Sequence, residues 1–232
     1  MNIKIFADGA DKSTILELYK NPIIRGFTTN PTLMHKAGIK DYEAFAKDIL
    51  AEVPDRPFSL EVFADDFDEM ERQARKIASW GSSVYVKIPI MNTKREDTMP
   101  LVRSLSLDGI KVNVTAMMTS LQVMRACRAL KGGAPAYISI FAGRIADTGR
   151  DPVGYMEQAV QYLEMFPNIE LIWASPRELL NIYQADAIGC HIITATNDIL
   201  KKLPLAEKTL YGYSLETVRM FYDDAKASGF TL

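Results

Sequence analysis

Short apolar runs alternate with amphipathic segments along the whole chain. An apolar run of about four to eight residues between turn residues is typical of a buried strand, whereas apolar positions about 3.6 residues apart predict a helix. The pattern predicts strands near residues 2–7, 23–29, 57–64, 83–89, 110–115, 135–141, 169–174 and 189–194. It predicts a helix after each strand, near residues 11–19, 41–52, 66–80, 95–106, 118–130, 152–164, 176–185 and 196–202.

Eight strand–helix units predict a (β/α)8 TIM barrel, an α/β fold, as a single domain over residues 1–232. An open, doubly wound sheet is the alternative, but no glycine-rich fingerprint follows the first strand. Helix signals support several boundaries, because Asp66 precedes an apolar-periodic stretch and Pro152 suits a first helical turn. Three glycines mark expected helix ends: Gly38, Gly109 and Gly189.

The segment 214–229 predicts one helix more than the barrel needs. Its apolar residues lie at helical spacing and form one face. They are Leu215, Val218, Phe221, Tyr222 and Ala225. We expect this C-terminal helix to pack either on the barrel or on a neighbouring subunit.

Composition narrows the class of protein. The chain has 232 residues, of which 48% are hydrophobic, and this is enough for one large domain with a substantial core. The net charge is −2 and no long block of one sign occurs, so we expect no nucleic-acid partner and no polybasic membrane anchor. No apolar run reaches transmembrane length, and charges come too early for a signal peptide. We therefore expect a cytoplasmic protein with no membrane association.

Cysteine and histidine give no sign of a metal site. Cys127 and Cys190 lie far apart without metal-ligand spacing, and we expect them to be buried, reduced thiols. His35 and His191 have no cluster of possible ligands around them. The sequence therefore predicts neither a metal nor any other cofactor.

A lysine interrupts the apolar run Val84–Pro89. Lysine is almost never fully buried unless it is paired or used in chemistry, because burying an ammonium is costly. Burial favours the neutral amine, and only the neutral amine attacks a carbonyl to form a Schiff base. On this run alone, Lys87 is either a reactive amine or a strand-end lysine whose head group reaches water.

Strand parity favours the reactive amine. Val84, Val86 and Ile88 share one side of the strand and suit the helix layer, which turns Lys87 toward the barrel interior. The same alternation turns polar residues inward in three neighbouring strands, and we expect the four to lie at comparable heights. They recur every 26 residues, as Glu61, Lys87, Asn113 and Ser139. Barrel interiors are normally filled by branched apolar residues, so this ring predicts an active site at the C-terminal mouth.

Residues at other strand ends extend the ring. Thr115 and Phe141 share the inward parity of Asn113 and Ser139. Asp8 ends the first strand, and Asn30 follows Thr28 and Thr29. A cap for the next helix is the less favoured alternative for Asp8.

The later strands carry signals of anion binding. Arg144 follows the sixth strand, and Ser175, Pro176 and Arg177 follow the seventh. TIM barrels often bind phosphate near the last two strands. Ser175 followed by Pro176 is also an ordinary helix start. Two arginines near one rim favour a phosphorylated substrate.

Four segments together resemble one enzyme family. Thr28–Leu33 (Thr-Thr-Asn-Pro-Thr-Leu) resembles the signature of transaldolases, and Val86–Pro89 resembles their Schiff-base strand. Ile138–Ile145 and Ala174–Arg177 resemble two further segments of that family. The length and the closing helix resemble the small subfamily that also holds fructose-6-phosphate aldolase. That resemblance implies a homo-oligomer, a pentamer or a decamer, acting on phosphorylated sugars in the pentose phosphate pathway.

The resemblance also implies roles for the ring residues. Lys87 attacks the ketose carbonyl, Glu61 with a water held by Thr115 moves protons during imine formation, and Asp8 takes the C4 hydroxyl proton. The remaining site residues are expected to bind substrate: Thr28, Asn30, Asn113, Ser139 and Phe141 around the dihydroxyacetone part, and Arg144, Ser175 and Arg177 at the distal phosphate.

Phe141 and Glu61 distinguish between two related activities, that of a transaldolase and that of an aldolase. At the position that matches Phe141, the family's free-standing aldolase has a tyrosine, and at the position that matches Glu61 it has a glutamine. The missing hydroxyl favours transfer to an aldose over release of free dihydroxyacetone. A fructose-6-phosphate aldolase, a transaldolase for a sulfonated ketose, and a barrel that only binds phosphorylated sugars are the alternatives.

Overall fold

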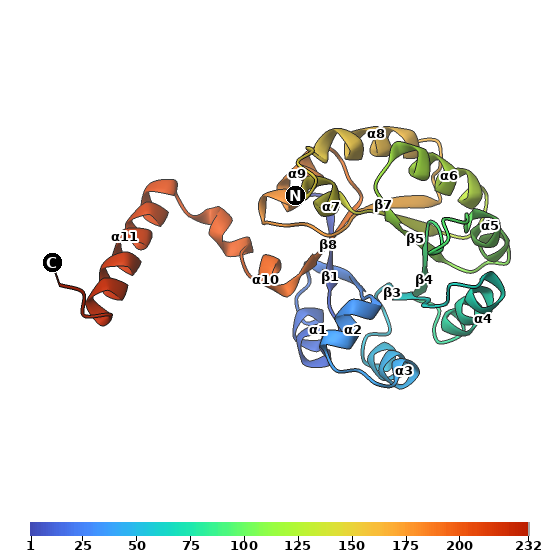
Figure 1. Cartoon of the computed structure of the whole chain (residues 1–232), viewed down its shortest axis with the longest axis horizontal. Coiled ribbons are helices and arrows are strands. Elements are labelled where there is room, and N and C mark those ends of the chain that lie inside the picture. Colours follow the sequence, from blue (N-terminus) through green and yellow to red (C-terminus); the bar gives the residue numbers. More distant parts are fainter. Residues whose placement is uncertain (232) are drawn as a thin grey trace.

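A computed structural model describes residues 1–231 of the chain. Eight parallel strands follow one another around a closed barrel, and helices cover its outside (Figure 1). The predicted TIM barrel is confirmed. The strands are β1 (Lys4–Asp8), β2 (Ile24–Thr28), β3 (Phe58–Glu61), β4 (Val84–Pro89), β5 (Val112–Met117), β6 (Ala136–Ile140), β7 (Ile169–Trp173) and β8 (Ile192–Thr196).

A helix layer surrounds the strands in chain order. The expected outer helices are α1 (Lys12–Tyr19), α3 (Tyr42–Glu52), α4 (Phe67–Ala78), α5 (Met99–Leu107), α6 (Ser120–Leu130), α8 (Val153–Leu163), α9 (Leu180–Ala187) and α10 (Asn197–Leu200). The sequence analysis missed three short elements: α2 (Pro31–Lys36), α7 (Ala142–Ala146) and the 3-10 helix Leu203–Glu207. Two of these, α2 and α7, begin directly after residues of the expected ring.

Local backbone chemistry sets several helix boundaries. The Asp66 side chain accepts hydrogen bonds from the N–H groups of Asp68 and Glu69, as expected of an N-cap. The expected helix 95–106 is wrong in its first turn, because Arg95 has a φ of 66° and α5 begins only at Met99. The three expected glycine stops are confirmed by their left-handed φ angles of 71°, 86° and 73°, at Gly38, Gly109 and Gly189.

Strand alternation divides the apolar residues into two cores. The outward residues of β4, including Val86 and Ile88, belong to the large core between strands and helices. A smaller cluster fills the N-terminal half of the barrel interior. It comprises Phe6, Tyr85, Tyr137, Ile172, Ala174 and Ile192. We call it the aromatic plug, because the stacked rings of Tyr85 and Tyr137, 3.9 Å between centroids, lie at its centre.

Both cysteines are free and buried within the described residues. Burial raises the pKa of the Cys127 and Cys190 thiols to about 12. The expectation of buried, reduced thiols is confirmed. None of the helices within residues 1–231 is long and apolar enough to cross a membrane.

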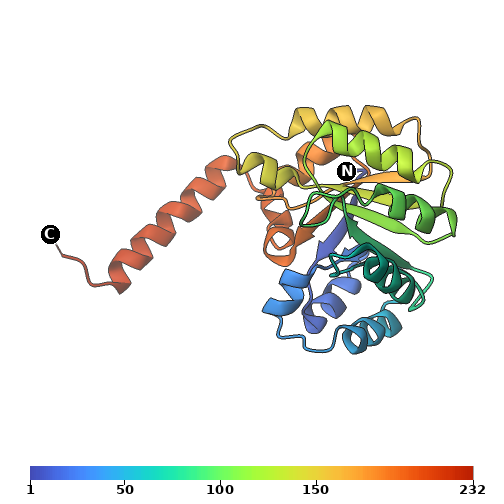
Figure 2. The same cartoon turned by 45° about the vertical axis from the view of Figure 1, so that its right-hand side comes forward.

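The last helix projects away from the barrel (Figures 1 and 2). Helix α11 spans Leu210–Ala227, capped by Thr209, so it begins before the expected residue 214. None of its residues is buried. Packing on the barrel of the same chain, one of the two expected arrangements, does not occur, and packing on a neighbouring subunit stays a prediction. The exposed large apolar side chains include Leu215, Val218, Phe221 and Tyr222.

We predict that α11 holds copies of the chain together, because exposed apolar faces of this kind mark interaction sites. The double substitution Val218→Asp and Phe221→Asp is expected to lower the mass measured by light scattering to that of a monomer of 26.0 kDa. Asp223→Asn, on the opposite face of the helix, serves as the control and keeps the native mass. A monomeric wild-type protein, or an unchanged mass in the double variant, contradicts the prediction.

Candidate active site

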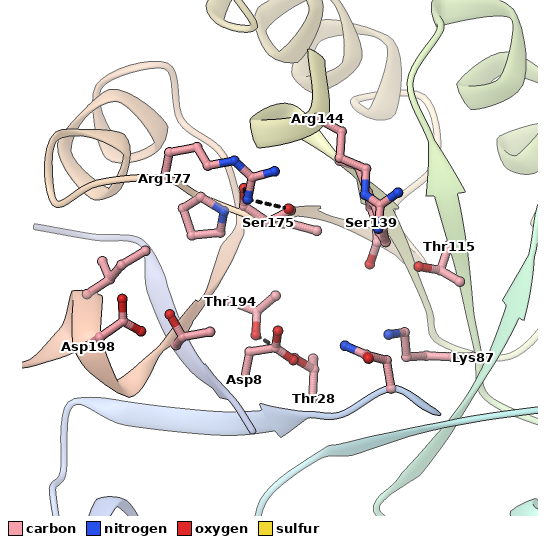
Figure 3. Close-up of a pocket in the computed structure, with 16 residues that line it drawn as sticks. Asp8, Thr28, Lys87, Thr115, Ser139, Arg144, Ser175, Arg177, Thr194 and Asp198 are labelled. Carbon is pink, nitrogen blue, oxygen red and sulfur yellow. Dashed lines mark hydrogen bonds between the residues drawn. The ribbon is translucent and has the colours of Figure 1, made fainter. Parts of the chain in front are cut away.

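A cavity of about 350 Å³ opens at the C-terminal end of the barrel strands (Figure 3). All the expected site residues except Glu61 and Asn113 line it. The lining comprises Asp8, Thr28, Asn30, Lys87, Thr115, Ser139, Phe141, Arg144, Ala174, Ser175, Pro176, Arg177, Thr194, Thr196, Asp198 and Ile199.

The aromatic plug explains why the cavity begins at this height. Lys87 follows Tyr85 by one inward step of β4, and Ser139 follows Tyr137 by one inward step of β6. Asp8 stands in the same relation to Phe6 on β1. Since side chains alternate along a strand, each polar group is placed directly above an apolar residue that closes the barrel beneath it.

Lys87 is buried, with 6% of its surface exposed, so the reading of a lysine that reaches water is excluded. Its Nζ donates to the carbonyl oxygen of Thr29 at 3.0 Å and lies 3.1 Å from Oε2 of Glu61. The register pairs Glu61 directly with Lys87 across β3 and β4. Glu61 is therefore the carboxylate in contact with the amine, although it is not among the residues that line the cavity.

Asp8 faces the cavity from the end of β1. Its Oδ1 accepts a hydrogen bond from the hydroxyl of Thr28 at 2.7 Å. Burial raises the pKa of the Asp8 carboxyl above its ordinary value, opposed by the charge of Lys87 and the hydrogen bond from Thr28. The helix-cap alternative is wrong, because Asp11 caps α1.

Asn113 lies behind the cavity wall, where both ends of its amide have partners. Its Nδ2 donates to Ser59 Oγ at 3.0 Å, and its Oδ1 accepts from Ser139 Oγ at 2.8 Å. The register pairs Asn113 with Tyr137 rather than Ser139, and β5 and β6 shift register farther along, between Val114 and Met117. Ser139 is therefore one inward step farther along the barrel than the equal spacing suggested.

Two further polar residues have atoms without a hydrogen-bond partner among the described residues. Asn30 caps α2 by accepting the Leu33 N–H at Oδ1, and its Nδ2 has no hydrogen-bond partner within residues 1–231. The hydroxyl oxygen of Thr115 is buried and has no hydrogen-bond partner within residues 1–231. Ala116, the next residue, has a φ of 63°, and such backbone strain is typical of functional sites.

The two arginines at the cavity differ in their surroundings. Arg144, on α7, lies over the ring of Phe141 at 5.4 Å and forms no ion pair with the described residues. Arg177 instead donates through Nε and Nη2 to both carboxylate oxygens of Asp147. This pairing holds the pKa of the Asp147 carboxyl below its ordinary value. The Arg144 guanidinium therefore has no carboxylate partner within residues 1–231, whereas that of Arg177 does.

Arg177 also forms hydrogen bonds within the loop that follows β7. Its Nη1 donates to the carbonyl oxygen of Ser175 at 3.2 Å and to Oγ at 3.0 Å. Ser175 has a φ of 61°, and α9 begins at Leu180, so the reading of Ser175 as a helix cap is wrong. A Cβ on Gly143 would lie 1.6 Å from the Ser175 carbonyl oxygen, so only glycine allows α7 this close approach.

The sequence analysis missed three polar residues of the cavity, Thr194, Thr196 and Asp198. The expected eighth strand ended at residue 194, whereas β8 runs to Thr196. The inward alternation of Thr194 and Thr196 is the signal that could have found them. Within the described part of the chain, no group of three or more His, Cys, Asp and Glu side chains is placed to hold a metal ion.

Comparisons with known proteins show similarity over most of the chain. A family profile described as "Transaldolase/Fructose-6-phosphate aldolase" matches residues 5–232. The chain is 35% identical over 215 residues to "Probable transaldolase 2" of Listeria monocytogenes, covering 91% of this chain and 94% of the relative. It is also 35% identical over 202 residues to "Probable transaldolase" of Thermoanaerobacter sp., covering 87% and 89% respectively.

Two solved structures share the fold at low identity. A 2,3-dimethylmalate lyase has a TM-score of 0.57 at 12% identity, covering 99% of this chain and 84% of that one. The 3-hexulose-6-phosphate synthase of Salmonella typhimurium has a TM-score of 0.57 at 13% identity, covering 87% and 91%. At such identities the likeness concerns the barrel fold alone.

We predict that Gly143→Ala displaces the Ser175 loop and impairs anion binding. The added Cβ forces backbone apart, which typically costs about 1–3 kcal/mol of unfolding free energy. Gly154→Ala on α8 is the control, because a Cβ there meets nothing within 4 Å. Thermal unfolding with and without inorganic phosphate measures both effects, and phosphate is expected to stabilise the wild type and the control more than Gly143→Ala. A Gly143→Ala protein with wild-type stability and phosphate response would falsify this account of the loop.

Proposed function

The chain belongs to the transaldolase/fructose-6-phosphate aldolase family, and from that membership we propose that it is a transaldolase of the pentose phosphate pathway. It transfers a dihydroxyacetone unit from fructose 6-phosphate or sedoheptulose 7-phosphate to an aldose phosphate. The single observation that carries the proposal is the buried Lys87 amine, 3.1 Å from the Glu61 carboxylate at the floor of a polar cavity.

The first stage of the proposed reaction is imine formation. The neutral Lys87 amine attacks C2 of the ketose, and a proton moves from Nζ to the former carbonyl oxygen to give a carbinolamine. Glu61 is close enough to take the proton from Nζ. The unpartnered hydroxyl of Thr115 is able to hold the water that carries protons to the departing C2 oxygen. Loss of water leaves a protonated imine.

The second stage breaks the bond between C3 and C4. Asp8 accepts the C4 hydroxyl proton, the aldehyde leaves, and the bonding electrons move into the imine to give an enamine. Burial raises the pKa of Asp8, which makes its carboxylate a stronger base for this step. An aldose acceptor then bonds to C3, Asp8 returns the proton, and water releases the new ketose from Lys87.

The remaining side chains position the substrate. The Asn30 amide and the Ser139 hydroxyl bind the dihydroxyacetone hydroxyls, and Asn113 acts through its hydrogen bond to Ser139. Arg144 and the Ser175 loop bind the distal phosphate, while Arg177 supports that loop and adds charge. No cofactor enters the proposal, because the imine itself accepts the electrons.

Phe141 favours transfer over aldol cleavage. It lines the cavity between Ser139 and Arg144 but has no hydroxyl to deliver a proton to the enamine. The enamine therefore waits for an aldose, which is the behaviour of a transferase. A phosphate and a sulfonate both suit Arg144 and the Ser175 loop, so a sulfonated ketose is the alternative donor.

Sodium borohydride is expected to trap a dihydroxyacetone-derived adduct on Lys87 in the presence of fructose 6-phosphate. Reduction of an imine is irreversible, so peptide mass spectrometry locates the modified residue. Lys87→Met is the control, and it is expected to form no adduct and to lose transfer activity. An adduct on another residue, or full transfer by Lys87→Met, contradicts the assignment of Lys87 as the Schiff-base residue. Saturable sugar binding without any adduct indicates the binding-only alternative.

Phe141→Tyr is expected to increase cleavage of fructose 6-phosphate in the absence of an aldose acceptor. The added hydroxyl supplies a proton donor beside the enamine, so free dihydroxyacetone leaves faster. A coupled assay for dihydroxyacetone measures the effect, with Phe141→Leu as a control that adds no hydroxyl. Equal acceptor-free rates for the wild type and Phe141→Tyr show that Phe141 does not decide between transfer and cleavage.

A further inference from the structure

Two hydroxyls and a carboxylate from neighbouring strands form a hydrogen-bonded chain at the cavity floor. Thr194 Oγ1 on β8 lies 2.6 Å from Thr28 Oγ1 on β2, and Thr28 Oγ1 lies 2.7 Å from Asp8 Oδ1 on β1. Figure 3 shows the three side chains together, opposite Lys87. Thr194 is 5% exposed and Thr28 is 2% exposed, so water competes little for these bonds.

The number of protons on the two hydroxyls determines which residue donates in each of these hydrogen bonds. Each hydroxyl has one proton, and the Thr28 proton is donated to the ionised Asp8 carboxylate. The contact between Thr28 and Thr194 therefore has Thr194 as donor. Hydrogen bonds in such a chain polarise one another, so the donation from Thr194 strengthens the donation from Thr28.

We propose that Thr194 is a positioning residue for the proton transfer at Asp8, an inference that rests on the proposed function. Thr194 holds the Thr28 hydroxyl in one orientation, and Thr28 in turn occupies Oδ1 of Asp8. Oδ2 is then the oxygen that takes the C4 hydroxyl proton and later returns it. The register supports this arrangement, because β8 pairs Thr194 with Phe6, one inward step below Asp8.

Other charges also act on Asp8. Lys87 faces it from β4 and favours its ionised form, whereas Glu61 faces it from β3 and disfavours that form. Asp198 lines the same cavity from α10. Substitution of Thr194 by valine changes none of these charges, so any change in the titration of Asp8 reports the hydrogen-bonded chain.

The effect on the pH profile has a definite sign. Asp8 acts in its ionised form, so activity falls as the pH drops through its pKa. Loss of the Thr194 donor weakens the stabilisation of the carboxylate and raises that pKa. Because a neighbouring bond strengthens a hydrogen bond by roughly 10–30%, the loss of Thr194 is expected to shift the pKa by roughly 0.1–0.7 unit. The acidic limb of kcat/KM therefore moves to higher pH in Thr194→Val.

The experiment compares Thr194→Val with Thr194→Ser, which keeps the hydroxyl, and with Thr14→Val on α1, which does not line the cavity. Only Thr194→Val is expected to shift the acidic limb for transfer from fructose 6-phosphate to an aldose phosphate. Borohydride trapping of the imine that Lys87 forms with added dihydroxyacetone is expected to match the wild type in all three variants, because this imine forms without the cleavage step at Asp8. If Thr194→Val does not fold, Thr194→Ala takes its place.

A direct titration separates failure of this inference from failure of the proposed function. Carbon-13 NMR of labelled aspartate follows the Asp8 carboxyl without any reaction, and its midpoint is expected to rise only in Thr194→Val. An unchanged midpoint, an unchanged acidic limb, or a shift that Thr194→Ser shares overturns the role of Thr194. If the Asp8 midpoint rises in Thr194→Val as expected, but the wild type neither transfers the three-carbon unit nor forms the adduct, the proposed function is overturned instead.

Discussion

The buried amine of Lys87 is the constraint on which the rest of the structure depends. An ammonium taken out of water is tolerated only with partners, and here they are the Glu61 carboxylate and the Thr29 carbonyl. Those partners come from β3 and from the end of β2, so the closed barrel itself places them.

Apolar packing residues and polar cavity residues occupy different heights along the axis of the barrel. Below, the aromatic plug of Phe6, Tyr85 and Tyr137 fills the space and excludes water. One inward step above, the same strands present Asp8, Lys87 and Ser139 to the cavity. The packing beneath therefore fixes the polar groups above it, and a short stretch of each strand supplies both.

Regular alternation made much of this predictable from sequence. The parity of β3 to β6 identified the inward polar residues, and the spacing of the strands identified the barrel. What the sequence did not reveal depends on contacts between distant segments. The shifted register of β5 and β6 depends on how two strands pair. The left-handed Ser175 and the pairing of Arg177 with Asp147 arise where loops meet. Thr196 was missed because the expected eighth strand ended at residue 194, whereas Thr194 lay inside that strand and its inward parity was open to prediction.

Transfer of a labelled three-carbon unit tests the central claim most directly. The protein is supplied with fructose 6-phosphate carrying carbon-13 at C1 to C3, with and without an aldose phosphate acceptor. A Schiff-base transaldolase moves the label into C1 to C3 of the new ketose phosphate and releases almost no labelled dihydroxyacetone. Equal release of free labelled dihydroxyacetone with and without the acceptor, and no label in a new ketose, would contradict the account.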